Sequence, residues 1–352
     1  MVTMEQLLRW ANDNDASDLH LSTGEPPALR VRGDLKRSEN QPLSGSDVLR
    51  LVESIMNDEQ KAELKDNWEC DFATALEGVG RYRVNAFIQH RGPGSVLRLI
   101  PSEIPTLESL GLTPIFKELC TRERGLVLVT GPTGSGKSTT LAAMVREINE
   151  TWDAHILTVE DPVEFVHQPL RCFVNQREVG MHTKSFSNAL RSALREDPDV
   201  ILVGEMRDLE TISLAITAAE TGHLVFGTLH TSSAPKTVDR IIDAFPGDQQ
   251  AQIRSMLSES LEAIIAQTLL KKKGGGRVAA QEILIGVPAV RNLIREQKLH
   301  QIPSMMQTGK GVGMCTMDMA LQELLKKGLI EASQIPKSPM AGMAGGAAAS
   351  AA

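Results

Sequence analysis

The sequence predicts an α/β protein in which a small α+β domain precedes a larger domain built on a mainly parallel sheet. Three observations support this fold class. From about residue 115, short apolar strands alternate with amphipathic helices, a pattern typical of a parallel sheet with helices on both faces. A glycine-rich run separates the first of these strands from its helix. Before residue 101, short alternating segments follow one amphipathic helix, which indicates a separate domain.

The first hundred residues predict a helix and several short strands. The helix is expected near the start, because Met4, Leu7, Leu8 and Ala11 recur at helical spacing. The strand candidates are residues 19–21, 28–32, 81–88 and 95–100. The last two strands are joined through a turn-forming segment, 91–94 (RGPG), and we therefore expect them to pair antiparallel. Three prolines in residues 101–114 then indicate an interdomain linker.

The larger domain is expected at 115–275, followed by a mainly helical C-terminal region at 276–338. Its predicted strands are residues 126–130, 156–160, 200–203 and 224–229, with helices around residues 140, 190 and 213. After residue 247 an apolar stripe predicts a helix through Ile253, Met256, Leu257, Leu261, Ile264 and Ile265. The basic, glycine-rich segment 271–277 is expected to be a flexible loop, and the Ala- and Gly-rich tail 339–352 to be disordered.

Size and composition limit the function classes. With 352 residues, 41% of them hydrophobic and 23% charged, the chain resembles an ordinary soluble protein of two or three domains. No apolar stretch reaches the roughly 18 residues of a membrane span, and no signal-peptide pattern opens the chain, so we expect a cytoplasmic protein. The four cysteines are far apart, which disfavours a zinc site or a disulfide framework. A net charge of −7 and 3% aromatic residues disfavour nucleic acid as a partner.

The run 131–138 (GPTGSGKS) matches the phosphate-loop pattern G-x-x-x-x-G-K-[ST], with a strand before it and a helix after it. Its glycines allow backbone N–H groups to approach phosphate oxygens, and the helix N-terminus adds positive charge. Lys137 would reach the β and γ phosphates, and Ser138 would hold Mg²⁺. The alternative is a glycine-rich turn that binds nothing. We predict ATP and Mg²⁺ as ligands, with nucleotide contacts from Gly131, Pro132, Thr133, Gly134, Ser135, Gly136, Lys137, Ser138 and Thr139.

Two acidic segments follow predicted parallel strands, at the ends where ligands bind in open α/β sheets. In residues 157–164 (LTVEDPVE), one of Glu160, Asp161 and Glu164 is a candidate to orient or deprotonate the attacking water. Each of these carboxylates could instead cap a helix or a turn. The segment 200–205 (VILVGE) fits a Walker B strand, in which Glu205 would hold the Mg²⁺ shell or a catalytic water.

Histidine and arginine side chains complete the predicted site. Residues 221–231 form an apolar strand with His223 at one end and His230 at the other, and His230 is the better candidate for a γ-phosphate sensor. Phosphoryl transfer also uses positive charge, which another domain or subunit can supply. Arg83 and Arg98 are the candidates for this role, because they cluster on two strands just before the linker. Solvation at the surface is the alternative for both.

Together, the phosphate loop, the Glu160-Asp161-Pro162 box, the 200–205 strand and the 221–230 histidine box resemble the type II/IV secretion ATPase superfamily. Residues 16–21 (ASDLHL), 194–198 (LREDP) and 289–296 (AVRNLIRE) narrow the resemblance to its pilus retraction ATPases, over nearly the whole chain. This resemblance implies a PAS-like α+β N-terminal domain and a RecA-like P-loop domain. It also implies catalytic roles for five residues, with Glu164 as general base, Glu205 as Walker B acid, His230 near the γ phosphate, and Arg83 and Arg98 brought to the nucleotide.

The resemblance further implies a Mg²⁺-dependent ATPase that works as a homohexameric motor and drives type IV pilus retraction and twitching motility. Its expected partners are an inner-membrane pilus platform protein and a paralogous retraction ATPase, and through them it would lie at the inner face of the cytoplasmic membrane. Pilus extension motors of the superfamily carry a cysteine-rich metal segment where this chain has 271–276 (KKKGGG). Two alternatives remain open: an accessory ATPase that assists a partner motor, and a nucleic-acid translocase.

Overall fold

The computed structural model describes residues 2–31, 33–100 and 103–335, which form two compact units. The N-terminal unit contains residues up to 104 together with the segment 161–167, and the C-terminal unit contains the rest. The first change from one unit to the other along the chain falls between Ile104 and Pro105. Arg32, at the end of a predicted strand, and the predicted disordered tail 339–352 lie outside the described residues.

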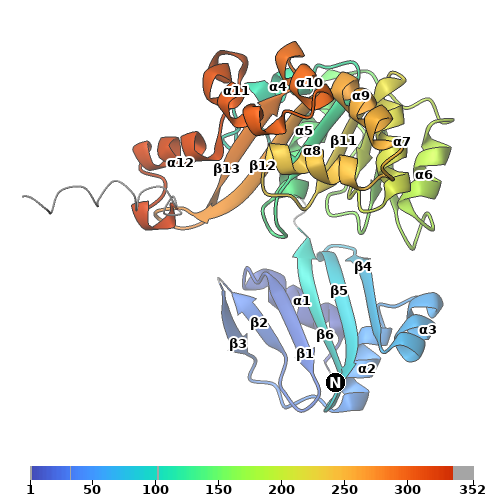
Figure 1. The fold of residues 1–352 in the computed structure, drawn as a ribbon. Coiled ribbons are helices and arrows are strands. Elements are labelled where there is room, and N and C mark those ends of the chain that lie inside the picture. Colours follow the sequence, from blue (N-terminus) through green and yellow to red (C-terminus); the bar gives the residue numbers. More distant parts are fainter. Residues whose placement is uncertain (1, 32, 101–102, 336–352) are drawn as a thin grey trace, which may run out of the picture. The chain divides into compact units, whose positions relative to one another are not determined.

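The N-terminal unit is one antiparallel sheet with helices packed on it, in the order β3-β2-β1-β6-β5-β4 (Figure 1). The predicted antiparallel pairing of the last two strands is confirmed, with Arg83 opposite Arg98. Buried leucines of the first two helices pack against the inward side chains of the sheet, among them Tyr82. The elements are α1 (Met4–Asp13), β1 (Asp18–Ser22), β2 (Ala28–Val31), β3 (Asp34–Arg37), α2 (Gly45–Glu53), α3 (Asp58–Asn67), β4 (Glu69–Leu76), β5 (Gly80–Gln89) and β6 (Gly92–Ile100).

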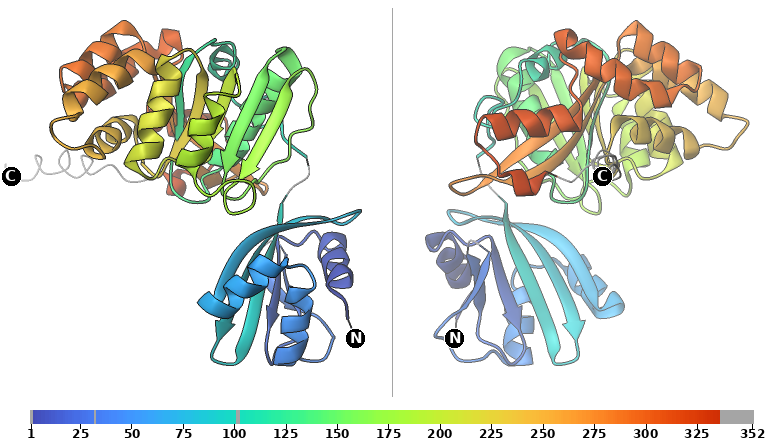
Figure 2. Two further views of the ribbon diagram at one scale, coloured as in Figure 1. Left: turned by 90° about the vertical axis from the view of Figure 1, so that its right-hand side faces the viewer. Right: turned by 60° about the vertical axis from the view of Figure 1, so that its left-hand side comes forward.

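The C-terminal unit is a seven-stranded sheet in the order β13-β12-β7-β11-β10-β8-β9, with helices on both faces (Figure 2). Six neighbouring strands run parallel, and β13 pairs antiparallel at one edge. The strands are β7 (Gly125–Thr130), β8 (His155–Glu160), β9 (Phe173–Glu178), β10 (Val200–Val203), β11 (Leu224–Leu229), β12 (Leu261–Lys271) and β13 (Arg277–Ile285). The four predicted strands of this domain are therefore confirmed, and so is the α/β fold class.

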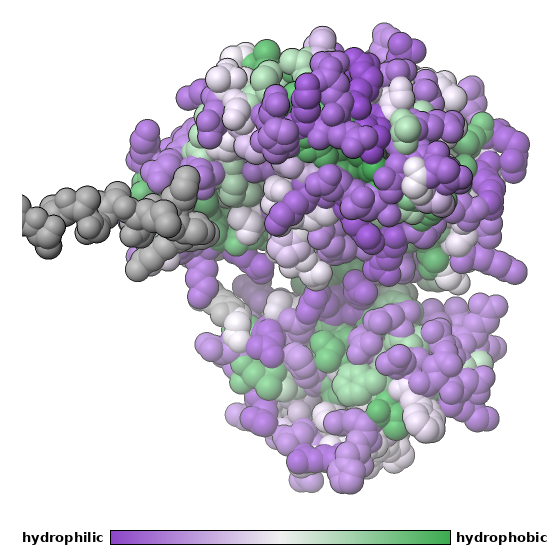
Figure 3. All heavy atoms as spheres, viewed as in Figure 1, coloured by the Kyte–Doolittle hydropathy of each residue, from purple (hydrophilic) through white to green (hydrophobic). Residues whose placement is uncertain are grey.

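The helices of this unit begin with α4 (Ile115–Leu119) and continue through the connections of the sheet. They are α5 (Lys137–Thr151), α6 (Phe186–Ala193), α7 (Leu209–Glu220), α8 (Ala234–Asp243), α9 (Gln250–Ser260), α10 (Pro288–Arg295), α11 (Ile302–Thr308) and α12 (Met317–Lys326). Among the described residues there are also three short 3₁₀ segments, η1 (Leu299–Gln301), η2 (Gly309–Val312) and η3 (Ala332–Gln334). Hydrophilic side chains cover most of the face seen in Figure 3.

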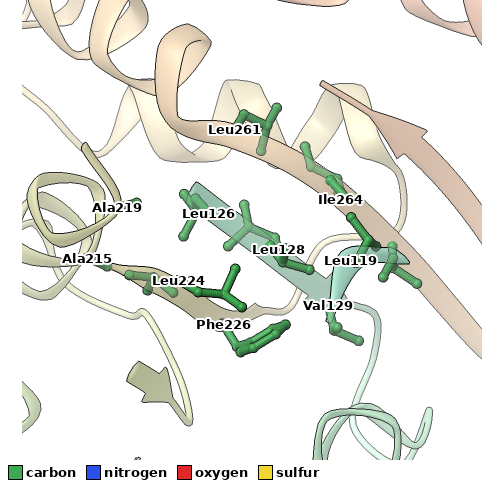
Figure 4. Close-up of a cluster of buried hydrophobic side chains, with 14 of the residues drawn as sticks. Leu119, Leu126, Leu128, Val129, Ala215, Ala219, Leu224, Phe226, Leu261 and Ile264 are labelled. Carbon is green, nitrogen blue, oxygen red and sulfur yellow. The ribbon is translucent and has the colours of Figure 1, made fainter. Parts of the chain in front are cut away.

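Strand β7 carries the glycine-rich loop and lies in the middle of the sheet, between β12 and β11. Figure 4 shows its side chains Leu126 and Leu128 packed between Leu261 and Ile264 of β12 and Phe226 of β11. All of these side chains are essentially inaccessible to solvent. A strand buried on both faces is a rigid platform, so the loop at its end is held at one place in the fold.

The predicted helix through Ile265 is wrong in its second half. Helix α9 ends at Ser260, and Leu261 begins strand β12, which pairs parallel with β7 and antiparallel with β13. The run Ala263–Ala266 is buried on every side, because the strand lies inside the sheet with both faces covered. A continuous apolar run of this kind satisfies a helical stripe as well as a buried strand.

Candidate active site

The carboxyl ends of β7, β11 and β10 lie side by side, because these three strands are neighbours in the sheet and run parallel. Thr130 at the end of β7 is opposite Leu229 of β11, and Gly227 is opposite Val203 of β10. Beyond the ladder, the Gly131 N–H donates to the carbonyl of Leu229 at 3.3 Å. The phosphate loop therefore starts at the same edge at which Glu205 and His230 follow their strands.

The loop takes the conformation that its glycines permit. Gly131, Gly134 and Gly136 have φ angles of +144°, +76° and +88°, which side chains with a Cβ rarely adopt. Gly136 directly precedes α5, a 15-residue helix whose N-terminal N–H groups and dipole favour an anion. Around Gly134 no atom lies within reach of an added Cβ, so the middle of the loop is open to a ligand.

Lys137 folds back over the loop that precedes it. Its Nζ donates to the carbonyl of Gly131 at 2.9 Å and to that of Pro132 at 3.2 Å. Neutral carbonyls are weaker acceptors for an ammonium group than phosphate oxygens are. Among the described residues, the hydroxyls of Thr130 and Ser135 are buried without a hydrogen-bond partner. An open glycine loop, a lysine folded over that loop and unsatisfied buried hydroxyls fit a phosphate-bearing ligand.

Glu205 is held by two cationic or potentially cationic side chains. Arg207 forms a bidentate pair with it, Nε to Oε1 at 2.7 Å and Nη2 to Oε2 at 2.8 Å, and His230 Nε2 lies 3.0 Å from Oε1. Burial alone would raise the pKa of Glu205, but Arg207, His230 and Lys137 outweigh it and leave this pKa below its ordinary value. The structure therefore brings together Lys137, Glu205 and His230, as the sequence predicts for a hydrolytic site.

Arg207 is a residue of the candidate site that no sequence pattern singles out. Its side chain is 69% exposed, while the side chain of Glu205 is only 20% exposed. An exposed arginine four residues beyond the end of a strand has no distinctive pattern, and only its spacing of two residues from Glu205 could have indicated the pair. A bidentate contact fixes the plane of a carboxylate as well as its charge.

Oxygen ligands suitable for Mg²⁺ occur on both sides of the loop. The Ser138 hydroxyl lies in the first turn of α5, and the ionised carboxylate of Glu205 lies at the end of β10. Both side chains are partly accessible to solvent. Mg²⁺ binds through one or two protein oxygens together with phosphate oxygens and water, so these two residues fit its requirements.

The three carboxylates of segment 157–164 have different surroundings. Glu160 accepts hydrogen bonds from the Thr158 hydroxyl at 2.7 Å and from Gln176 Nε2 at 3.2 Å, both within its own sheet. Asp161 and Glu164 belong to the segment 161–167, which groups with the N-terminal unit. Asp161 is exposed and Glu164 is half-buried. Glu160 therefore acts first as a partner within the sheet, while the role of Glu164 stays a prediction.

His223 lies at the opposite end of β11 from His230. The strand has six residues and spans about 20 Å at the usual rise per residue. The His223 ring bonds the carbonyl of Ala218 at 2.9 Å, in the turn between α7 and β11. This histidine is a structural residue at the far edge of the sheet, and only His230 reaches Glu205.

Arg83 and Arg98 lie directly opposite each other on β5 and β6 of the N-terminal unit, and both are exposed. Like charges in this position repel each other. Asp18 on β1 offsets part of the repulsion, because Arg98 Nε donates to its Oδ1 at 2.8 Å. Burial alone would raise the pKa of Asp18, but the bonds from Arg98 and Ser17 leave this pKa below its ordinary value. The strands thus present two guanidinium groups on one exposed face.

The segment 289–296 forms most of α10, with Val290 and Ile294 buried against the C-terminal unit. Arg291 donates through Nη2 to Glu262 at 2.7 Å, and Glu262 also pairs with Arg122 at 3.5 Å. This network ties the helix to the start of β12.

Comparison with known proteins places these features in a family. The family model described as Type II/IV secretion system protein matches residues 2–317. The chain is 59% identical to the type IV pilus retractation ATPase PilT of Pseudomonas aeruginosa, over 95% of this chain and 98% of PilT. It is 43% identical to the type IV pilus ATPase PilU of the same organism, over 93% of this chain and 86% of PilU. A crystal structure of the pilus retraction motor PilT with bound ADP is similar with a TM-score of 0.89 and 50% identity, covering 95% of this chain and 96% of the other.

Proposed function

The chain belongs to the Type II/IV secretion system protein family, and from this premise we propose that it is an ATPase motor that drives type IV pilus retraction. The observation that carries the proposal is the contact of Glu205 with His230 and Arg207 at the strand ends beside the phosphate loop. The similarity to PilT over nearly the full length of both proteins supports the same function.

In the proposed reaction, the backbone N–H groups of the loop and the ammonium of Lys137 hold the phosphates of ATP. Ser138 and Glu205 would hold Mg²⁺, which neutralises charge on the phosphate oxygens. Glu164 accepts a proton from the attacking water, and His230 responds to the γ phosphate from its contact with Glu205. Arg83 and Arg98 supply positive charge to the transferred phosphoryl group.

The proposed assembly is a homohexamer with a PAS-like N-terminal domain, residues 1–100, and a RecA-like core in each subunit. The part of the chain that the structure describes contains no helix with the length and apolarity of a membrane span. We place the motor in the cytoplasm, attached to the inner face of the membrane through a pilus platform protein. Light scattering on the purified chain with and without nucleotide tests the hexamer, and a mass below six subunits in both states contradicts it.

Two measurements with Lys137→Ala test the proposal. The purified wild-type chain should hydrolyse ATP only with Mg²⁺ present, and the variant should lose this activity. In cells, loss of retraction should leave more surface pili than in wild type and no twitching. Bare cells would indicate an extension motor instead, and turnover that survives the substitution would contradict the assigned site.

The 43% identity to PilU makes an accessory retraction ATPase the second candidate. The higher identity to PilT, 59%, favours the main motor. A strain that carries this protein as its only retraction ATPase separates the two, since pili retract there if the chain is the main motor and stay extended if it is accessory.

A further inference from the structure

A chain of buried hydrogen bonds connects the edge of the sheet to the phosphate loop. Gln281 of β13 donates through Nε2 to Oε1 of Gln267 on β12 at 3.0 Å, and the hydroxyl of Thr140 on α5 donates to the same oxygen at 2.9 Å. Gln267 in turn donates through Nε2 to the carbonyl oxygen of Ser135, in the loop itself, at 2.6 Å. All four residues are at most 9% exposed.

The orientation of the Gln267 amide follows from its neighbours. The Ser135 carbonyl can only accept a hydrogen bond, so it must face the NH₂ group of the glutamine. The amide oxygen then faces two donors, the Thr140 hydroxyl and the Gln281 amide. Both ends of this side chain are therefore satisfied, as a buried amide requires.

Gln267 lies directly beyond the point where β12 stops pairing with β7. Ala266 is opposite Thr130, the last residue of β7, and beyond this pair the chain next to β12 is the phosphate loop. The loop packs closely against this side chain, because a Cβ on Gly136 would lie 2.9 Å from Gln267 Nε2. The backbone ladder between β12 and β7 ends here. The hydrogen bond from the Gln267 side chain to Ser135 takes its place.

We propose that Gln267 is a positioning residue for nucleotide binding, because it fixes the peptide unit between Ser135 and Gly136. In a planar trans peptide the C=O and N–H groups point in opposite directions. With the carbonyl of Ser135 held on Gln267, the N–H of Gly136 is directed away from the Gln267 amide. This role rests on the proposed function, in which loop N–H groups bind the phosphates of ATP.

Apolar packing of the sheet does not explain why amides occupy these positions. The preceding residues of β12, Ile264 to Ala266, are apolar and fully buried, and an apolar side chain at 267 would continue that pattern without burying two amide groups. Gln267 is opposite Gln281, so the second glutamine meets the first directly in the ladder. The loop carbonyl needs a donor, Gln267 supplies it, and Gln281 and Thr140 keep the donor turned toward the loop.

Matched substitutions in the full chain separate positioning from stability. Gln267→Leu removes the donor to the loop, while Gln281→Leu removes one outer bond of the same network and leaves that donor in place. Binding of a fluorescent ADP derivative is measured for both variants, with thermal unfolding in the absence of nucleotide. With both variants measured at a temperature where thermal unfolding shows each of them folded, we expect about a 10-fold or greater loss of affinity for Gln267→Leu and about 3-fold or less for Gln281→Leu. Equal losses in both variants, or none in Gln267→Leu, overturn the proposal.

A third variant covers the case in which Gln267→Leu does not fold. In Gln267→Glu the protonated acid can still donate to the Ser135 carbonyl, whereas the carboxylate can only accept. Its affinity for the ADP derivative, relative to wild type, should therefore fall as pH rises through the pKa of the introduced acid. A ratio that does not change with pH overturns the proposal. If the wild-type chain itself binds no ADP derivative, the proposed ATPase function fails, which is a different outcome.

Discussion

Two alanine substitutions in the phosphate loop should differ sharply in their effect on folding. A Cβ on Gly131, where φ is +144°, would lie 2.6 Å from Ser135 Oγ and even closer to the backbone carbonyl oxygen of Gln267. A Cβ on Gly134, where φ is +76°, would contact nothing within 4 Å. Both changes place a residue with a Cβ in the left-handed region, which destabilises the folded state by about 1–2 kcal/mol. Only Gly131→Ala adds a steric clash with the backbone of a buried strand, which costs about 1–3 kcal/mol more.

Thermal unfolding of the two variants without nucleotide measures this difference, because bound ligand would otherwise add stability of its own. For a unit of this size, 1 kcal/mol corresponds to about 2–4 °C in Tm. Gly131→Ala should therefore melt about 2–12 °C below Gly134→Ala, which serves as its control for the backbone conformation. Equal melting temperatures would refute the argument that β12 confines the loop.

Three further predictions concern charged side chains. Burial raises the pKa of Glu282 above its ordinary value of 4.5, so the folded chain binds this proton more readily than the unfolded chain, and stability falls as pH rises above 4.5. Glu282→Gln should therefore lose less stability than wild type between about pH 5 and pH 8 in denaturant titrations, and an identical pH slope would contradict this. Arg98→Met should raise the depressed pKa of Asp18 and, at neutral pH, destabilise the N-terminal unit by about 1–3 kcal/mol, as NMR titration and unfolding would show. The contribution of the Arg98–Asp18 bond to stability disappears as pH falls through the pKa of Asp18 in the folded state. A difference in stability between wild type and variant that persists in strong acid would contradict this prediction. Arg207→Met should lower kcat about 10-fold or more while Tm changes little, because the exposed arginine orients Glu205 but contributes little to stability. An unchanged kcat would show that the pair has no such role.

The predictable part of this site is the part encoded locally. The strand, glycines, lysine and helix of the phosphate loop are consecutive in the sequence, so the motif can be recognised from one short segment. Glu205 and His230 follow apolar strands, so their convergence could be inferred from the rule that parallel strands end at one edge. The error at Leu261 has the same origin, because a continuous apolar run does not reveal whether it is buried in a helix or a strand. Sheet order decides that question, and sheet order is not a local property.

Gln267 shows what a motif leaves undetermined. The loop sequence specifies which residues can approach a phosphate, but the direction of its peptide units depends on a strand more than a hundred residues later. Ser135 and Gln267 are 132 positions apart, and their contact exists because β12 lies beside β7 in the sheet. In the sequence, Gln267 is a polar residue at the end of an apolar run, a feature equally typical of a strand that reaches solvent. Only the fold shows that this polar side chain is buried and that its partner is the carbonyl of the phosphate loop.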